Sequence, residues 1–199
     1  MNITQAKTIQ IGSRPISAVY LGTQKIWPKL PYTPLSYVTF NGSATIRTDI
    51  VNANTPTIIC DCQPTNGALF GASNGANIFA LTTTIGSWYD YMILSGTPAA
   101  RNIGTASGRL TVNVTGTTAT IGSITATIRA PATNNSLDLG SVSGQNMTRL
   151  TGNIYSFQIL KSGVLVCDMI PAQYNGVVGM WDRARQQFYP PIVGTLTGA

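Results

Sequence analysis

The sequence predicts an all-β fold: an antiparallel two-sheet sandwich preceded by a small N-terminal β-hairpin. Between turn signals, apolar and polar residues alternate in short runs, as half-buried strands require. No window keeps a helical spacing, and a short helical turn near residues 180–187 is the one exception we expect. The dipeptide Asn-Gly, which tolerates the positive φ angles of tight hairpins, occurs at 41–42, 66–67, 74–75 and 175–176.

The N-terminal segment, residues 1–30, has a character of its own. Residues 16–21 and 24–27 are predicted to pair as a hairpin that turns at 22–23. A lone hairpin is marginally stable in water, so it must pack on the sandwich, on another copy or on a partner. The alternative is that residues 1–29 only add edge strands to the sandwich. The apolar residues expected to dock are Val19, Tyr20, Leu21, Ile26 and Trp27.

A connector follows over residues 31–36. Pro31 and Pro34 make this stretch stiff and extended, because each proline disfavours helix at the residue before it. The sandwich is then predicted to occupy residues 37–199. Three runs in it alternate clearly enough to assign an inward face: Leu110, Val112 and Val114; Ile124, Ala126 and Ile128; and Tyr155, Phe157 and Ile159. Turns at 116–117, 122–123 and 162–163 separate these strands from their neighbours.

Charge is scarce. Charged residues make up 9% of the 199 residues, whereas hydrophobic residues reach 43%, enough for a core. The net charge is +6, but the basic residues form no stripe, so we expect no nucleic-acid partner. The chain has no secretory signal and no apolar stretch long enough to cross a bilayer, so we expect no membrane insertion. The three cysteines, Cys60, Cys62 and Cys167, are expected to be buried free thiols, although a pair with Cys167 stays open.

The sequence lacks the residues that most catalytic mechanisms use. The chain has no His and no Glu, and its side-chain carboxylates are six aspartates. This argues against Ser-His-Asp or Cys-His catalysis and against the common zinc sites. We therefore expect no enzyme, no cofactor and no metal. A calcium site at Asp90 beside Tyr91, or at Asp138 beside Asn134 and Asn135, is the remaining alternative.

The best functional lead is the densest aromatic cluster, Trp88, Tyr89, Asp90 and Tyr91. Aromatic rings stack on sugars or fill partner pockets, and Asp90 can accept hydrogen bonds from hydroxyl groups. These residues are the predicted carbohydrate-binding site. The alternative is that the rings simply pack in the core.

Three stretches carry a resemblance to a known family. Residues 154–189 contain Lys-Ser-Gly-Val-Leu-Val, then Asp-Met-Ile-Pro, then Val-Gly-Met-Trp-Asp and finally Phe-Tyr. This order resembles the C-terminal signature of concanavalin A-like (laminin-G-like) jelly-roll domains in bacteriophage virion proteins. Residues 37–49 resemble the opening strand pair of the same domain. Residues 19–28 resemble short N-terminal modules of phage tail and fibre proteins.

The resemblance implies a two-sheet, concanavalin A-like jelly roll on a virion that is assembled in the bacterial cytoplasm. The chain would then be a tail, fibre or receptor-binding component and a homo-oligomer. Its N-terminal hairpin would dock to other virion proteins, and its sandwich would contact a host surface glycan. The paired Glu motif of the glucanases with this fold is missing. The alternatives are a capsid decoration or head-fibre protein without a ligand, and a free carbohydrate-binding module.

Overall fold

The computed structural model describes residues 9–11, 14–16, 19–21, 24–27, 30–51, 56–73, 78–94, 97–129, 135–142 and 147–199. The described residues contain strands and turns and no helix. The chain divides into two compact units, Met1–Thr33 and Pro34–Ala199. This division falls inside residues 31–36, the segment predicted to be a connector.

Two short hairpins make up the described part of the first unit. Strand β1 (Ile9–Ile11) pairs antiparallel with β2 (Arg14–Ile16), and β3 (Val19–Leu21) pairs antiparallel with β4 (Gln24–Trp27). The prediction of one strand over residues 16–21 is wrong, because Ile16 belongs to β2 and pairs with Ile9. Two alternating isoleucines in β1 are too short a run for periodicity to identify a strand.

The predicted docking residues lie in this second hairpin. Strand β3 contains Val19, Tyr20 and Leu21, and β4 contains Ile26 and Trp27. The side chain of Val19 is half-buried. The side chains of the other four lie outside the part of the chain that the structure describes.

The remaining strands range in length from 2 to 17 residues. Strand β5 (Thr33–Pro34) spans the division between the units. The second unit contains β6 (Val38–Asn41), β7 (Ile46–Val51), β8 (Thr57–Ser73), β9 (Ile78–Thr84), β10 (Ser87–Leu94), β11 (Thr97–Thr105), β12 (Leu110–Thr115), β13 (Thr118–Ile121), β14 (Ile124–Thr127), β15 (Ser136–Leu139), β16 (Thr151–Lys161), β17 (Val164–Tyr174), β18 (Val177–Asp182), β19 (Gln187–Tyr189) and β20 (Thr197–Gly198).

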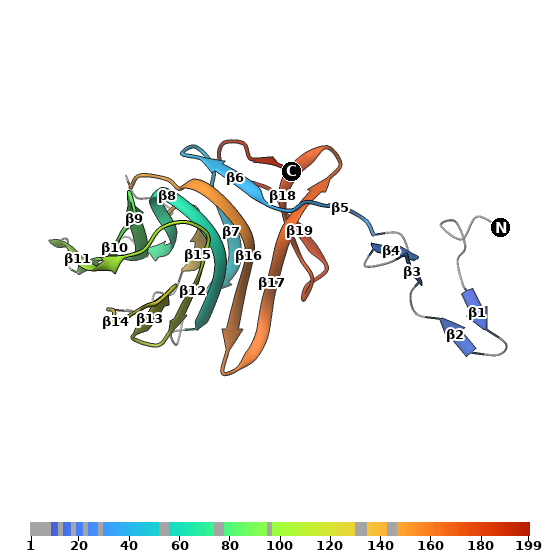
Figure 1. Cartoon of the computed structure of the whole chain (residues 1–199), viewed down its shortest axis with the longest axis horizontal. Coiled ribbons are helices and arrows are strands. Elements are labelled where there is room, and N and C mark those ends of the chain that lie inside the picture. Colours follow the sequence, from blue (N-terminus) through green and yellow to red (C-terminus); the bar gives the residue numbers. More distant parts are fainter. Residues whose placement is uncertain are drawn as a thin grey trace. The chain divides into compact units, whose positions relative to one another are not determined.

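Strand β8 organises the large antiparallel sheet of the second unit. Its first half lies between β12 and β16, and its second half lies between β9 and β15. One run of paired strands is therefore β14-β13-β12-β8-β16-β17-β18-β19, and the other is β11-β10-β9-β8-β15-β7. The two runs meet again at their edges, where β11 lies against β14 and β19 against β7. Figure 1 shows β8 and β16 as long curved strands through the middle of the unit. The arrangement fits the predicted β-sandwich.

Two glycines allow the chain to pack closely where β8 bends. Gly67 has φ of 96° and Gly152 has φ of 132°, both in the region that favours glycine. A Cβ atom on Gly67 would meet the backbone of Arg149, and one on Gly152 would meet the backbone of Gln63. Any side chain at either position would push the two backbones apart.

The main core fills the space between the two runs of strands. Its largest fully buried side chains include Trp88, Phe40, Phe70, Phe79 and Phe157. The predicted strand order β12, turn, β13, turn, β14 is confirmed. Period two predicted which residues of three strands face inward. Of these residues, five are buried: Val112, Val114, Ile128, Phe157 and Ile159.

Tyr155 departs from this prediction. In the pairing of β16 with β8 the register shifts between Ile154 and Ser156, so Tyr155 is an extra residue in β16. Such a bulge turns one side chain away from the strict alternation. Ile154 and Phe157 therefore both face the core, and the half-buried Tyr155 ring points the other way, against the guanidinium of Arg109.

A smaller apolar cluster covers the opposite face of β8 and β9. Ile78 and Ala80 alternate with the core residues Phe79 and Leu81, so they face outward from the core. They pack with Ala68, Val142 and the half-buried Met147. Val142 and Met147 therefore cover part of this face of β8 and β9.

The predicted helical turn near residues 180–187 is wrong. Residues 180–182 end β18, residues 183–186 form a turn, and Gln187 starts β19. The carboxylate of Asp182 accepts hydrogen bonds from the backbone N–H groups of Ala184 (2.9 Å) and Arg185 (3.3 Å). An aspartate that caps a turn in this way lets the chain reverse within four residues and return as a strand.

Candidate functional site

Trp88, the first residue of the predicted carbohydrate site, lies in the core. Its side chain is 0% exposed, and its indole N–H donates to the carbonyl oxygen of Ala106 at 3.0 Å. A buried indole with its one donor satisfied is a structural feature of an interior. The interpretation of Trp88 as core packing is therefore correct, and its ring is not offered to a sugar.

Asp90 is also withdrawn from solvent. Its carboxylate is 0% exposed, and Oδ2 accepts from Arg101 (3.0 Å), from the Arg129 side chain (3.0 Å) and from the Arg129 backbone N–H (2.9 Å). Arg129 also donates to the carbonyl oxygens of Asp90 and Ala99. The group joins β10 and β11 to the chain that follows β14, and it is not open to a sugar hydroxyl or a cation.

The other two predicted residues do not restore the site. Tyr89 is half-buried in β10 and faces away from Trp88, as neighbours in a strand do. Tyr91 continues β10, but its side chain lies outside the part of the chain that the structure describes. The described residues of 88–91 therefore form no shared aromatic surface.

Aspartate and arginine are paired throughout the described part of the second unit. Five of the six aspartates lie within 4 Å of an arginine, which occupies acceptor sites that a ligand or metal would otherwise use. The described residues contain no cluster of three potential metal ligands, and Asp138 of the calcium alternative is bound by Arg47. The pairs are Arg109–Asp61 (2.7 Å), Arg101–Asp90 (3.0 Å), Arg47–Asp138 (3.1 Å), Arg183–Asp168 (2.8 Å) and Arg185–Asp182 (3.8 Å).

All three cysteines are buried free thiols, as predicted. Burial raises the pKa of the Cys60 thiol, and its hydrogen bond with Cys62 raises it further. Burial likewise raises the pKa of Cys167, with the Asp182 carboxylate adding to the effect. A thiol with a raised pKa is a poor nucleophile and a poor metal ligand, because both roles need the thiolate.

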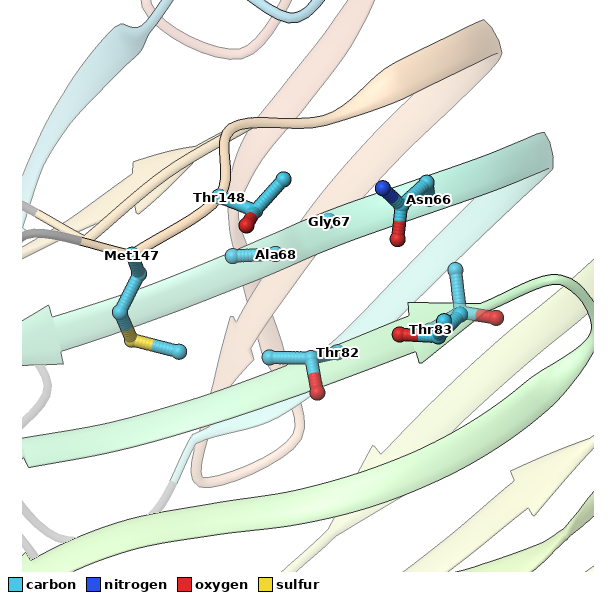
Figure 2. A pocket seen from close by; sticks show the side chains of 8 residues that line it. Asn66, Gly67, Ala68, Thr82, Thr83, Met147 and Thr148 are labelled. Atoms are coloured by element: carbon cyan, nitrogen blue, oxygen red, sulfur yellow. The ribbon is translucent and has the colours of Figure 1, made fainter.

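A hollow of about 250 Å³, here called the threonine pocket, lies on the outward face of β8 and β9. Figure 2 shows its floor on β8, one side wall on β9, and the third side at Met147 and Thr148, across β8 from β9. The residues that line it are Asn66, Gly67, Ala68, Thr82, Thr83, Thr84, Met147 and Thr148.

Local packing fixes the shape of this pocket. The backbone N–H of Ala68 donates to the carbonyl of Thr148 at 2.9 Å, which holds the third wall against the floor. A Cβ atom on Gly67 would meet the backbone of Arg149, so the lack of a side chain there lets the chain that follows Thr148 pack closely on β8. The Thr83 hydroxyl is committed, since it donates to the Ser87 carbonyl at 3.2 Å.

The chemistry of the pocket is neutral hydrogen bonding. Its walls offer the hydroxyls of Thr82, Thr84 and Thr148 and the amide of Asn66. Ala68 and Met147 add apolar surface. No lining residue carries an ionisable group, so the pocket has no acid, base or nucleophile of its own. It suits an uncharged ligand with several hydroxyl or amide groups and one apolar face.

Sequence reasoning missed this pocket. Its residues come from three segments that only the folded sheet brings together, and threonine is common all along the chain. The run Thr82-Thr83-Thr84 was the one local signal, and it has the composition of any exposed strand end.

A scan against known protein families and a search among curated proteins each found no match to this chain. Among the described residues, no helix is long and apolar enough to span a membrane.

Proposed function

We propose that this chain is a non-enzymatic protein of a bacteriophage particle, whose concanavalin A-like jelly-roll sandwich holds an uncharged host glycan in the threonine pocket. The glycan-binding part of the proposal rests on the lining of the pocket, which combines hydroxyl and amide groups with the apolar side chains of Ala68 and Met147 and has no ionisable side chain. Sugars present the same combination of hydroxyl groups and an apolar ring face.

The pairing of aspartates supports a role without catalysis. Glycoside hydrolysis needs two carboxylates flanking one bond, and one of them must carry a proton. Five of the six aspartates are instead held by arginines. None of the aspartates lines the threonine pocket.

The proposed place in a phage particle is supported by the resemblance of residues 154–189 and 19–28 to phage virion proteins. The compact first unit, Met1–Thr33, is separate from the sandwich unit, as expected of an attachment segment. Its described parts are two-stranded hairpins, which are marginally stable on their own and need a surface to pack on.

Glycan-array binding followed by calorimetry on the hits tests the pocket. Thr82→Val removes one hydroxyl at nearly constant shape, and we expect it to weaken binding by about tenfold, the worth of one hydrogen bond to a ligand. Thr125→Val, at an exposed residue of β14 that does not line the pocket, is the matched control and should bind like wild type. If the wild-type chain binds no glycan, or if Thr82→Val binds as tightly as wild type, the pocket is not a glycan site. The proposed function would then become that of a capsid decoration or head-fibre protein without a ligand.

Removal of residues 1–29 tests the attachment. We expect the shortened chain to keep a folded sandwich and its glycan affinity, and to lose incorporation into particles. Unchanged incorporation would exclude the first unit as the attachment segment.

A further inference from the structure

Three two-residue turns of the sandwich share one backbone conformation. They are Ile85–Gly86, with φ of 47° and 81°; Ser162–Gly163, with 49° and 78°; and Asn175–Gly176, with 50° and 81°. Each joins two neighbouring antiparallel strands. Asn-Gly is the preferred pair for such a turn, because asparagine tolerates a positive φ and isoleucine does not.

Ile85 is therefore unfavourable at its position on two counts. A β-branched side chain in the left-handed region is strained, and Ile85 is the one β-branched residue among the described non-glycine residues with positive φ. Its side chain is also 86% exposed, so burial does not offset the strain. Strain that persists without a packing reason points to a functional contact.

The position of Ile85 suggests what it contacts. It directly follows Thr84 of the threonine pocket, and its backbone N–H donates to the carbonyl of Thr65 at 3.1 Å. On the other side of the turn, the Gly86 carbonyl accepts from the N–H of Ala106 at 2.8 Å. Ile85 thus lies between the pocket and the chain that leads to Arg109.

Arg109 is part of an ordered surface group. Its guanidinium lies 3.8 Å from the centre of the Tyr155 ring and forms two hydrogen bonds to Asp61, at 3.1 and 2.7 Å. The Tyr155 hydroxyl donates to Gln63 at 3.1 Å. We call Asp61, Gln63, Arg109 and Tyr155 the arginine–tyrosine stack. Asp61 balances the charge of Arg109, so the stack is neutral overall.

The stack and the pocket lie on the same side of β8. Asp61 and Gln63 alternate with buried cysteines and face outward. The register of β8 against β16 then skips Thr65, which is an extra residue in β8. An extra residue reverses the alternation, so Asn66 of the pocket faces the same side as Gln63.

We infer that the pocket, Ile85 and the arginine–tyrosine stack form one continuous binding surface for an extended, uncharged oligosaccharide, with Ile85 against the apolar face of a sugar ring. This inference builds on the proposed glycan binding at the pocket. A neutral ligand fits because the pocket has no ionisable lining residue and the charges of the stack are paired. A saccharide fits better than a protein, because the surface offers many hydrogen-bonding groups and a single exposed apolar side chain, whereas protein interfaces centre on larger apolar anchors.

Calorimetric titration with neutral oligosaccharide ladders, built from glucose, mannose, galactose or N-acetylglucosamine and running from monosaccharide to hexasaccharide, tests the inference. Wild-type affinity should rise with chain length in the ladder that binds. Ile85→Asn should weaken binding of the longer sugars by about fivefold or more, and it should raise Tm by about 2–4 °C because the strain is relieved. Arg109→Lys, which keeps the charge but loses the planar stack, should weaken only the longer sugars.

Ser162→Asn is the matched control, since Ser162 has the same backbone conformation at the β16–β17 turn. It should leave binding of every ladder unchanged. Affinity that does not grow with length, or wild-type affinity in Ile85→Asn, overturns the extended surface alone and leaves the pocket intact. An unchanged or lower Tm in Ile85→Asn removes the strain on which the inference stands. Absence of wild-type binding to every ladder overturns the proposed glycan binding together with this inference.

Discussion

Two places in the sandwich combine an aromatic ring, an aspartate and arginine, and they differ in exposure. At the first, Trp88 and Asp90 are fully buried, and two arginines reach the carboxylate from the surface. At the second, Tyr155 is half-buried, and the Arg109 side chain that pairs with Asp61 is 57% exposed. The same chemical groups thus stabilise the fold at one place and form a presented surface at the other.

The difference shows that residue type alone does not mark a binding site. A buried carboxylate must be paired, because an unpaired charge in the interior is strongly unfavourable. An exposed pair contributes little to stability, so its geometry is free to serve recognition. Substitutions at the first place should therefore act on the free energy of unfolding, and those at the second should act mainly on binding.

The rings give the largest expected contrast. Trp88→Ala should lower the free energy of unfolding by about 4 kcal/mol, because it leaves a large cavity and an unpaired Ala106 carbonyl. Tyr155→Ala should lower it by about 1 kcal/mol, because the ring contacts Arg109 at the surface. Urea denaturation followed by circular dichroism measures both. Similar losses for the two variants would contradict the assignment of Trp88 to the core and Tyr155 to the surface.

The carboxylates give the next contrast. Asp90→Asn should lower the free energy of unfolding by about 3 kcal/mol, because it leaves Arg101 and Arg129 without a counter-charge beside a buried group. Both arginines keep some contact with water, at 48% and 30% exposure, which limits the effect. Asp61→Asn should change the same quantity by less than about 1 kcal/mol.

Added salt separates the two cases. Raising the ionic strength should shrink the small effect of Asp61→Asn and leave most of the Asp90→Asn effect, since a buried pair is screened less. If Asp61→Asn proves the more damaging of the two, burial is not what distinguishes these places.

Local patterns in the sequence predicted several hairpin turns, whereas Asn66-Gly67, which has the composition of a tight turn, lies inside β8. The turns at 116–117, 122–123 and 162–163 join strands as expected, because a hairpin depends on a few adjacent residues. The all-β class followed from the same signals. Period two failed at Tyr155, where an extra residue in β16 reverses the face, and nothing in the adjacent letters announces such a bulge.

The candidate site was harder to predict from the sequence than the fold class. Trp88 lies in a run that could serve an interior or a surface, and only its distant contact with Ala106 separates the two. The threonine pocket joins β8, β9 and residues 147–148, so its location depends on which strands pair. The strain at Ile85, in contrast, had a local signal, since an Ile-Gly pair stands where a tight hairpin turn favours Asn-Gly.

Asp168 is intermediate in exposure between the two places, and its expected effect is small. Asp168 is 8% exposed, whereas the side chain of its partner Arg183 is 50% exposed. Burial alone would raise the pKa of Asp168, but the hydrogen bonds from Arg183 and Gln158 outweigh it and lower the pKa below its ordinary value of 3.8. A carboxylate whose pKa is lower in the folded chain stabilises the fold above the unfolded pKa, and this contribution is lost as the pH falls through the folded pKa.

Asp168→Asn should therefore lower the free energy of unfolding at pH 7 by about 1 kcal/mol or less, with much of the pair exposed. The difference from wild type should shrink below about pH 4, where the unfolded chain takes up a proton that the folded chain resists. Urea denaturation from pH 7 down to pH 2.5 measures it, with Asp49→Asn, at an exposed aspartate, as the acid-to-amide control. A difference that stays constant down to pH 2.5 would show that Asp168 stabilises the sandwich through its shape and hydrogen bonds. Its charge would then not contribute, and the half-exposed pair would resemble neither of the two places compared.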